Sequence, residues 1–401
     1  MSTLPRRPKT ICIVVGEESG DLLGSELILA LKDRLGDDVT FCGVGGERMK
    51  AAGFASFFDM TDIAVMGLTA VLARLPLIVK RVYQTVSGVV AAKPDVLIII
   101  DSPDFTHNVA RRVRKRAPDI PIIGYVSPSV WAWRSGRARK MSVYVDELLA
   151  LLPFEPEVHE RLGGPRTHYV GHPIIERVDR FRPKEGERTP VSSDNKVLLV
   201  LPGSRGSEVD RLLADFGTTV ARLAERFDRL EVLLPAVPHM VERIRRDVAD
   251  WPVKPEIVLG EDAKHAAFRR AHAALAASGT VSLELALAGV PMAICYKLDW
   301  FYRRLKDLNK VIRIVSATSM VLPNIILGRN VVPEFLDDEV NADRLEPVIA
   351  GLLTDSETRR SQVEAFRDLD HLMRLPDDRC QSAAAADVVV DCLERRDVGG
   401  R

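Results

Sequence analysis

A chain of 401 residues is too long for one hydrophobic core, so its length predicts two domains. Hydrophobic residues make up 46% of the sequence and charged residues 28%, which argues against intrinsic disorder. The 56 basic residues equal the 56 acidic ones, so the net charge of zero gives no general attraction to nucleic acid. An anionic partner would have to meet a local cluster of cations.

Short β-branched runs alternate with helical patterns along most of the chain, as in parallel α/β folds. Continuous apolar character, rather than alternation, indicates strands that are covered on both faces. In the first half, the runs that predict strands are Thr10–Val15, Val39–Gly43, Asp95–Ile100, Pro121–Val126 and Glu147–Leu152.

Residues 179–196 are polar, contain two prolines and have no apolar period, which predicts a linker. A second α/β series follows, with strands expected at Val197–Gly203, Leu230–Pro235, Ala271–Ala277 and Pro291–Lys297, and a helical tail from about Asn341. We therefore expect two Rossmann-like domains whose parallel sheets face a central cleft. Residues 1–178 form the first domain and 197–364 the second, with the C-terminal helix (about 365–398) as a candidate to complete the first. Ligands of such sheets bind beyond the carboxyl ends of the strands.

The five cysteines are scattered and form no C-x-x-C pair. Several lie in apolar runs, a pattern typical of buried free thiols in a reducing cytosol. The first ten residues, MSTLPRRPKT, lack the apolar core of a signal peptide, and no segment approaches the roughly 20 apolar residues that span a bilayer. We expect a cytoplasmic protein.

Two loops of the first half carry candidate chemistry. After the first strand, GEESGDLLG brings glycines to a helix start, but Glu17, Glu18 and Asp21 would repel a pyrophosphate, so a site for hydroxyl groups fits better than a nucleotide site. A tight turn with a helix cap is the alternative. After the third strand, DSPDF places Asp101 and Asp104 three residues apart, where burial beside a like charge would raise the pKa of one toward that of a general base. Simple helix capping is again the alternative.

Two loops of the second half favour a nucleotide diphosphate. LPGSRGSEVDR places Gly203, Ser204 and Arg205 between a buried strand and a helix, where a guanidinium and helix-start amides can bind phosphate. ASGTVSLEL opens another helix with three small residues and places Glu284 one turn later, where it can accept hydrogen bonds from ribose hydroxyls; the small residues are Ser278, Gly279 and Thr280. Ordinary capping could explain either loop alone.

No H-E-x-x-H motif occurs, and the D-x-D at Asp368–Asp370 is typical of a solvated helix face. We expect no metal and no other cofactor, so that Arg205 and helix amides stabilise a leaving diphosphate.

The ordered motifs resemble those of lipid A disaccharide synthases, a bacterial glycosyltransferase family of the GT-B fold. The resemblance covers most of the chain and rests on GEESGDLLGSELI, GVGGERM, VMGLTAVLARLP, DSPDF, YVSPSVWAWR, LLPFEPEVHERLGG, YVGHPI, LPGSRGSEV, ASGTVSLELAL, PMAICYK and LPNIILGRNVVPEFL. Three residues depart from the family pattern, which puts local hydrogen bonding in doubt: Thr106, Gly124 and Asp337.

The resemblance implies an inverting transfer of a sugar from UDP-2,3-diacylglucosamine to 2,3-diacylglucosamine 1-phosphate, which gives a β-1,6-linked disaccharide and UDP. It implies Asp104 as the base for the acceptor 6-hydroxyl, with Asp95, Glu17 and Ser19 in the same catalytic group. On the UDP side, it implies Arg205, Gly279, Thr280, Glu284, Asn324 and Glu334, beside Ser204 and Ser278 of the two loops above. A UDP-sugar epimerase is the alternative enzyme. The absence of G-x-G-x-x-G disfavours a dehydrogenase, and a lipid-binding protein without catalysis would not need DSPDF beside a nucleotide pocket.

The segment YVSPSVWAWRSGRARK combines aromatic rings with cations, which suits an acceptor that carries a phosphate and acyl chains. We expect Trp133, Arg134 and Arg137 to bind the acceptor phosphate. The alternative is that Trp131 and Trp133 pack structurally where the domains meet.

The apolar stretch Val65–Val82 and the basic run Arg111–Arg116 indicate a peripheral membrane face on the first domain, at the cytoplasmic side of the inner membrane. A core helix and a solvated face are the alternatives. No nucleic acid is expected as a partner, and the sequence leaves an oligomer open.

Overall fold

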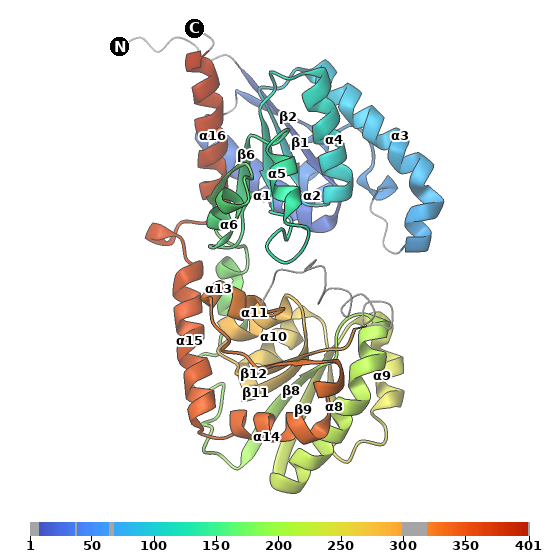
Figure 1. Cartoon of the computed structure of the whole chain (residues 1–401), viewed down its shortest axis with the longest axis vertical. Helices are drawn as coiled ribbons and strands as arrows, with labels where there is room; N and C mark the ends of the chain where they lie inside the picture. Colours follow the sequence, from blue (N-terminus) through green and yellow to red (C-terminus); the bar gives the residue numbers. More distant parts are fainter. Residues whose placement is uncertain (1–7, 37, 64–67, 299–318, 400–401) are drawn as a thin grey trace. The chain divides into compact units, whose positions relative to one another are not determined.

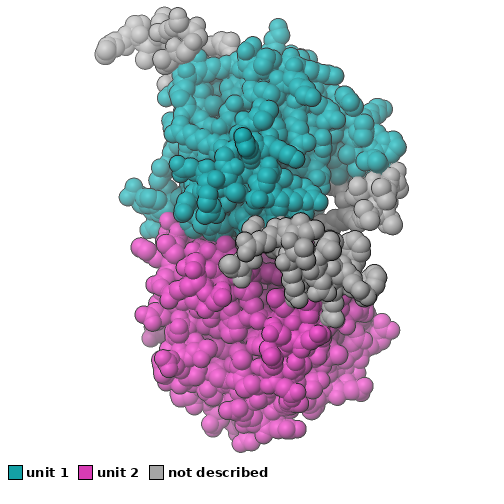
Figure 2. All heavy atoms as spheres, viewed as in Figure 1, with its two compact units in different colours: residues 1–172, 375–401 teal, residues 173–374 magenta. Residues whose placement is uncertain are grey.

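Two parallel β-sheets organise the chain into two units, which are described separately (Figures 1 and 2). The computed structural model describes residues 8–36, 38–63, 68–298 and 319–399. Unit 1 contains Met1–His172 and Leu375–Arg401, and unit 2 contains Pro173–Arg374. The chain therefore leaves unit 1, builds unit 2 and returns to unit 1 for its last helix.

The sheet of unit 1 has the order β3-β2-β1-β4-β5-β6-β7, and its neighbouring strands pair in parallel. Its strands are β1 (Lys9–Val15), β2 (Val39–Val44), β3 (Ala55–Ser56), β4 (Val96–Ile100), β5 (Ile122–Tyr125), β6 (Glu147–Ala150) and β7 (Arg166–Tyr169). Every residue of the central strand β4 is buried. This burial explains the continuous apolar sequence of the central strands, because helices cover both faces.

The helices of unit 1 are α1 (Glu18–Leu35), α2 (Glu47–Ala51), α3 (Leu68–Ala92), α4 (Pro103–Arg116), α5 (Gly136–Met141), α6 (Glu155–Arg161) and α16 (Gln381–Gly399), with 3-10 turns η1 (Met60–Asp62) and η5 (Pro376–Asp378). Helix α3 packs on α4, and the C-terminal α16 packs on α1 (Figure 1). Apolar side chains of α16 enter the core of unit 1. Arg395 of α16 also forms an ion pair with Glu147, and Arg396 donates to the Asp95 carbonyl oxygen at 2.7 Å.

The sheet of unit 2 has the order β10-β9-β8-β11-β12-β13 and is parallel as well. Its strands are β8 (Asn195–Leu201), β9 (Arg229–Ala236), β10 (Glu256–Leu259), β11 (Ala273–Ala277), β12 (Met292–Tyr296) and β13 (Glu334–Leu336). Its helices are α7 (Val178–Phe181), α8 (Gly206–Arg226), α9 (Val241–Asp247), α10 (Glu261–Arg270), α11 (Val281–Leu287), α13 (Leu322–Leu327), α14 (Ala342–Leu352) and α15 (Glu357–Met373), with 3-10 turns η2 (Ile175–Arg177), η3 (Pro238–Met240) and η4 (Asp337–Glu339).

The segment predicted as a linker, residues 179–196, is part of unit 2. It begins in α7, and the guanidinium of Arg188 donates to the carbonyl oxygens of Phe268, Ala288 and Gly289 at 3.0, 3.0 and 2.8 Å. The segment is polar because its side chains bind backbone carbonyls near the ends of α10 and α11. The two divisions of the chain lie instead at 172/173 and 374/375, between α15 and α16 on the C-terminal side.

A single carboxylate closes the glycine-rich turn between β2 and α2. Asp21 of α1 is buried, and it accepts hydrogen bonds from the backbone N–H groups of Gly46, Arg48 and Met49 at 2.7, 2.9 and 3.2 Å. These are the free donors at the start of α2, which has no cap of its own. Asp21 therefore has a structural role within unit 1.

Replacing Asp21 by Ala should lower the free energy of unfolding by about 1–3 kcal/mol, because it leaves buried N–H donors without an acceptor. Urea unfolding followed by far-UV circular dichroism measures this change. Glu18→Ala is the matched control, since Glu18 lies in the same turn of α1 but is exposed. Equal stability of the two variants would contradict the capping role.

Candidate active site

Three loops of unit 1 lie side by side because their strands are paired in register. Val15 at the end of β1 pairs with Ile100 at the end of β4, and Ile100 pairs with Tyr125 at the end of β5. The loops that follow these three residues therefore leave the same edge of the sheet. They contain the sequence motifs GEES, DSPDF and VSPSVWAWR.

Strained backbone marks this edge. Asp101, Ser102, Val126 and Arg134 all have positive φ, at 52°, 41°, 75° and 54°. Such conformations cost about 1–3 kcal/mol each and concentrate at functional sites. The Asp101 N–H donates to the Tyr125 carbonyl at 3.0 Å, and the Val126 N–H donates to the Leu149 carbonyl at 3.0 Å. Strand pairing thus continues into the strained residues and holds them.

Gly16 and Ser102 approach each other too closely for a larger residue at position 16. A Cβ on Gly16 would lie 2.6 Å from the Ser102 Cβ. The glycine after β1 is therefore required by the turn after β4, which joins the two loops sterically.

The carboxylates of the two loops differ in their surroundings. Asp104 is exposed in the first turn of α4, where the helix dipole favours a negative charge. Asp101 is half-buried and accepts a hydrogen bond from the Ser19 hydroxyl at 3.0 Å. Glu17 is exposed at the N-cap of α1. The structure thus places Ser19, Asp101 and Asp104 on one edge, but Asp104 lacks the burial that the sequence argument expected.

Asp95 does not belong to this group, contrary to the prediction. It lies just before β4, six residues before Asp101, and a strand rises about 3.3 Å per residue, so the two are roughly 20 Å apart. Asp95 is buried and accepts a hydrogen bond from the Thr10 N–H at 2.9 Å. It links the start of β4 to β1, which is a structural role.

The two tryptophans of the third loop have different environments. Trp131 packs edge-to-face on Phe154 within unit 1, with ring centroids 5.5 Å apart. Trp133 is 45% exposed, and the guanidinium carbons of Arg134 and Arg137 lie 4.5 and 5.3 Å from its ring centroid. Neither arginine has a carboxylate partner among the residues that the structure describes. We call Trp133, Arg134 and Arg137 the Trp133 cluster.

Parallel strand pairing also brings two loops of unit 2 together. Leu201 at the end of β8 pairs with Ala276 of β11, so the loops containing Arg205 and Ser278–Thr280 leave adjacent strands. The side chain of Arg205 is 79% exposed and binds the Glu208 carboxylate at 2.8 Å. The N–H groups of Ser204 and Arg205 donate to the same carboxylate at 3.1 and 3.2 Å.

The second of these loops presents small, exposed residues. Gly279 and Thr280 are exposed, and a Cβ on Gly279 would meet no atom within 4 Å. Ser278 donates to the Met320 carbonyl at 3.1 Å. Glu284, one turn into α11, lies 3.1 Å from the ammonium group of Lys264. Burial lowers the pKa of Lys264, but Glu284 and Glu261 raise it by more, so its positive charge is retained beside Glu284.

Asn324 and Glu334 bind each other, and Glu334 binds the Met320 backbone that Ser278 also contacts. Asn324 is buried; its amide N–H groups bind Val332 O and Glu334 at 2.9 Å each, and its oxygen accepts from the N–H groups of Val331 and Val332. The carboxylate of Glu334 also binds Ser319 and the Met320 N–H. The protein therefore uses the polar groups of Asn324 itself, which does not fit the predicted contact with UDP.

The three departures from the family pattern have local explanations. The Thr106 hydroxyl donates to Asp101 O at 2.6 Å, which stabilises the strained turn. Gly124 lies in β5, where a Cβ would come within 2.9 Å of Leu148 Cδ1. Asp337 has a positive φ of 52° and accepts a hydrogen bond from the Leu298 N–H at 2.9 Å. Each of the three residues fits the backbone around it.

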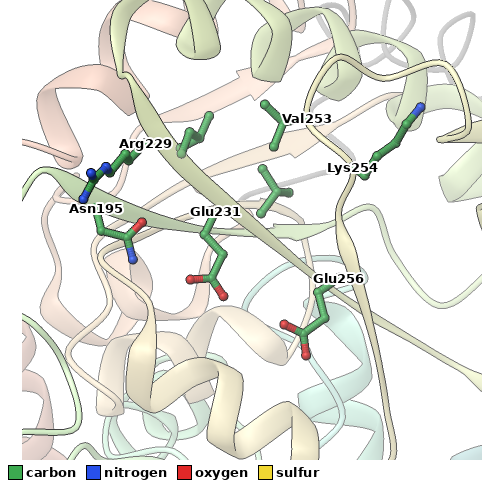
Figure 3. Close-up of a pocket in the computed structure, with 8 residues that line it drawn as sticks. Asn195, Arg229, Glu231, Val253, Lys254 and Glu256 are labelled. Carbon is green, nitrogen blue, oxygen red and sulfur yellow. The ribbon is translucent and has the colours of Figure 1, made fainter.

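One hollow of unit 2 lies away from these loops (Figure 3). Asn195, Arg229 and Glu256, the first residues of β8, β9 and β10, line it together with Glu231, Val253 and Lys254. It lies at the amino ends of the strands, whereas ligands of parallel sheets bind at the carboxyl ends. Among the described residues, no three His, Cys, Asp or Glu side chains come together as ligands for a metal.

Comparison with known proteins gives a consistent assignment. A family model described as lipid-A-disaccharide synthetase matches residues 11–388. The lipid-A-disaccharide synthase of Nitrobacter winogradskyi is 51% identical over 389 residues, which cover 96% of each chain.

Two solved structures are similar in fold. The glycotransferase of kitacinnamycin has a TM-score of 0.59 at 16% identity, covering 97% of this chain and all of the other. UDP-GlcNAc 2-epimerase from Neisseria meningitidis has a TM-score of 0.55 at 11% identity, covering 96% of this chain and all of the other. The two Rossmann-like units are thus those of the GT-B fold, and the chain belongs to the lipid-A-disaccharide synthase family of glycosyltransferases.

Proposed function

We propose that this protein transfers 2,3-diacylglucosamine from its UDP conjugate to the 6-hydroxyl of 2,3-diacylglucosamine 1-phosphate, with inversion at C1. The products are the β-1,6-linked disaccharide 1-phosphate and UDP. Family membership over nearly the whole chain supports the reaction class. The observation that supports the assignment of roles is that Asp104, in the first turn of α4, and the Trp133 cluster follow the neighbouring strands β4 and β5 at one edge of the unit 1 sheet.

Asp104 is the base in this proposal. Its exposed carboxylate takes the proton of the acceptor hydroxyl as that oxygen bonds to C1 of the donor sugar. The bond between C1 and the diphosphate oxygen breaks at the same time, and its electron pair leaves with UDP. Ser19 and Asp101 bind each other beside this position and hold the neighbouring loop in place.

Unit 2 binds UDP in this proposal. Arg205 and the N–H groups at the start of α8 stabilise the diphosphate, for which Arg205 must exchange Glu208 for phosphate; its 79% exposure leaves it free to do so. Gly279 and Thr280 allow the nucleotide to approach the backbone closely. Glu284, held by Lys264, accepts hydrogen bonds from the ribose hydroxyls.

The Trp133 cluster binds the acceptor in this proposal. Two arginines without carboxylate partners among the described residues suit a phosphate monoester, since guanidinium groups bind phosphate through paired hydrogen bonds. The exposed indole offers apolar surface beside them for the sugar ring or an acyl chain. An epimerase would have no acceptor, so acceptor-dependent UDP release separates the two enzymes.

UDP release with both lipid substrates tests the function. Asp104→Asn should lower kcat by about 10²–10⁴-fold, because the base contributes that much to proton transfer, while the affinity for UDP stays unchanged. Asp119→Asn is the control, since Asp119 is exposed just beyond the other end of α4. A kcat for Asp104→Asn close to that of the wild type would remove Asp104 from the mechanism.

Turnover should persist in excess EDTA, because Arg205 and the α8 amides supply the positive charge that the leaving diphosphate needs. The rate of UDP release before and after chelation measures this. Loss of activity that Mg²⁺ or Mn²⁺ restores would show that a metal ion takes part.

Helix α3 carries the proposed membrane face. Leu75, Val79 and Tyr83 are 48%, 46% and 47% exposed and repeat every four residues, so they form one apolar stripe. Arg74 and Lys80 are exposed beside it, where their side chains can reach lipid headgroups. Residues 65–67 of the predicted stretch lie outside the described residues. The described helices include none with the length and apolarity that crossing a bilayer requires.

The basic run on α4 offers less positive charge to a membrane surface than its sequence indicates, because some of its side chains bind within unit 1. Arg111 stacks on Tyr144 and Arg114 forms an ion pair with Asp146. Arg112 stacks on Tyr83, which adds one cation to the apolar stripe of α3. We propose peripheral binding at the cytoplasmic face of the inner membrane through this stripe.

Leu75→Ser combined with Val79→Ser should reduce sedimentation with vesicles that contain anionic lipid, and UDP binding by unit 2 should be unaffected. High salt should weaken vesicle binding of the wild type, because screening reduces the attraction between cations and headgroups. Val143→Ser is the control, since Val143 is 75% exposed elsewhere on unit 1. Normal vesicle binding by the folded double variant would place the membrane face elsewhere.

A further inference from the structure

Strand pairing in unit 1 brings together two cysteines that are far apart in the sequence. Cys12 of β1 and Cys42 of β2 are direct partners in the register of these parallel strands, and their Sγ atoms lie 3.1 Å apart. The partners two residues earlier lie on the same face, and the hydroxyl oxygens of Thr10 and Thr40 are likewise in contact, at 3.3 Å. The scattered cysteines of the sequence therefore include one pair of neighbouring free thiols.

The spacing of the two strands suits a disulfide. Neighbouring strands lie about 4.8 Å apart, and disulfides join Cα atoms that are about 4.4–6.8 Å apart. The sulfur atoms need to approach by about 1 Å more to reach an S–S bond length of about 2.05 Å, which side-chain rotation supplies. A bond between Cys12 and Cys42 therefore requires no change of strand register.

The residue after Cys42 keeps the two strands close. Gly43 has a φ of 137°, and a Cβ at this position would collide with the Ile13 carbonyl oxygen. Glycine in a strand marks such a close approach of two backbones. The backbone thus holds the two sulfur atoms where a bond between them can form.

The two thiols differ in their access to solvent. Cys12 is fully buried in the core of unit 1, whereas Cys42 is only partly buried. The hydrogen bond from Cys12 favours the thiolate of Cys42 and lowers the pKa of Cys42, while the same hydrogen bond and burial raise the pKa of Cys12. Because the thiolate is the reactive form, an oxidant from solvent meets the more reactive sulfur first.

Packing alone explains one cysteine of the pair better than the other. A buried free thiol behaves as a small apolar side chain, which accounts for Cys12 in the centre of the sheet. Cys42 packs only partly against the same core, so burial stabilises it less. Its position opposite a second thiol is the feature that packing leaves unexplained.

We propose that Cys12 and Cys42 form a reversible dithiol–disulfide site, in which a hydroperoxide oxidises Cys42 and Cys12 then resolves the product. The Cys42 thiolate attacks one peroxide oxygen, the O–O bond breaks, and the leaving oxygen takes up a proton. With hydrogen peroxide this gives a sulfenic acid on Cys42 and one water. The Cys12 sulfur next attacks the Cys42 sulfur, and the S–OH oxygen leaves as a second water with the Cys12 proton.

Reduction restores the two thiols. A dithiol reductant attacks the disulfide by exchange, is itself oxidised to a disulfide and returns one proton to each cysteine. In the oxidised form, the bond would close the segment of chain that contains the GEES loop and α1. The proposal concerns the thiols alone and does not depend on the sugar transfer proposed above.

The test treats the folded, reduced chain with hydrogen peroxide, removes the peroxide with catalase and unfolds the chain in excess N-ethylmaleimide, which blocks the remaining thiols. Trypsin separates the two cysteines because Lys32 and Arg34 lie between them. Without reducing agent, we expect residues 10–32 joined to residues 35–48, lighter by two hydrogens than the two peptides together. Dithiothreitol added before blocking should return both as separate peptides.

Two variants are the controls. Cys380 is exposed and lies 3.6 Å from the Ser382 hydroxyl, so Cys380→Ser should leave the linked peptide unchanged. Cys42→Ser should abolish it and leave Cys12 fully blocked by maleimide, because the buried thiol has lost the partner that reacts first. The linked peptide is measured in the wild type, so the result stands even if either variant fails to fold.

Three results would overturn the proposal. The first is that Cys42 accumulates as sulfinic or sulfonic acid without the linked peptide, which would show that Cys12 does not resolve it. The second is that both thiols remain fully blocked by maleimide after peroxide. The third is that Cys42 pairs with Cys12 no more selectively in the folded chain than in a chain unfolded in urea before oxidation.

Discussion

The close approach of Gly16 and Ser102 determines how the functional edge of unit 1 is built. Only a glycine after β1 leaves room for the left-handed turn after β4. That turn starts α4 one residue later, which places Asp104 in the first turn of the helix and brings Asp101 to Ser19. The strain at the turn is held by hydrogen bonds to the neighbouring strand and to Thr106. A steric contact between two loops thus sets the position of the proposed base more directly than any polar interaction does.

The sequence predicted the central strands of each sheet but not its edge strands. All nine predicted strands are present. Four further strands were not predicted, and they are the edge strands of the two sheets: β3, β7, β10 and β13. Central strands are buried on both faces and are therefore continuously apolar, whereas edge strands are short and partly polar. The error at residues 179–196 has the opposite cause, because side chains such as Arg188 are polar there in order to bind carbonyl groups within unit 2.

The positions of the candidate site residues were predictable where they follow a central strand, and their surroundings were less predictable where these depend on tertiary contacts. Motif position placed Asp104, Arg205 and the Trp133 cluster just after central strands, and the structure has them there, since parallel pairing brings strand ends together. Their roles in binding and catalysis stay predictions. Asp95 and Asn324 match the family pattern equally well, but motif position does not reveal that a side chain is buried and bound within the protein.

The return of the chain to unit 1 affects the order in which the protein can be completed during synthesis. The ribosome delivers α1 first and α16 last, yet the two helices pack together in one core. Unit 2 is continuous in the chain, so it can finish folding while unit 1 still lacks its final helix. Until α16 has been synthesised, the apolar face of α1 in the nascent protein lacks its partners from α16. A premature stop shortly after Arg374 would therefore release a chain whose second unit is whole and whose first retains an uncovered apolar surface, open to chaperones and proteases.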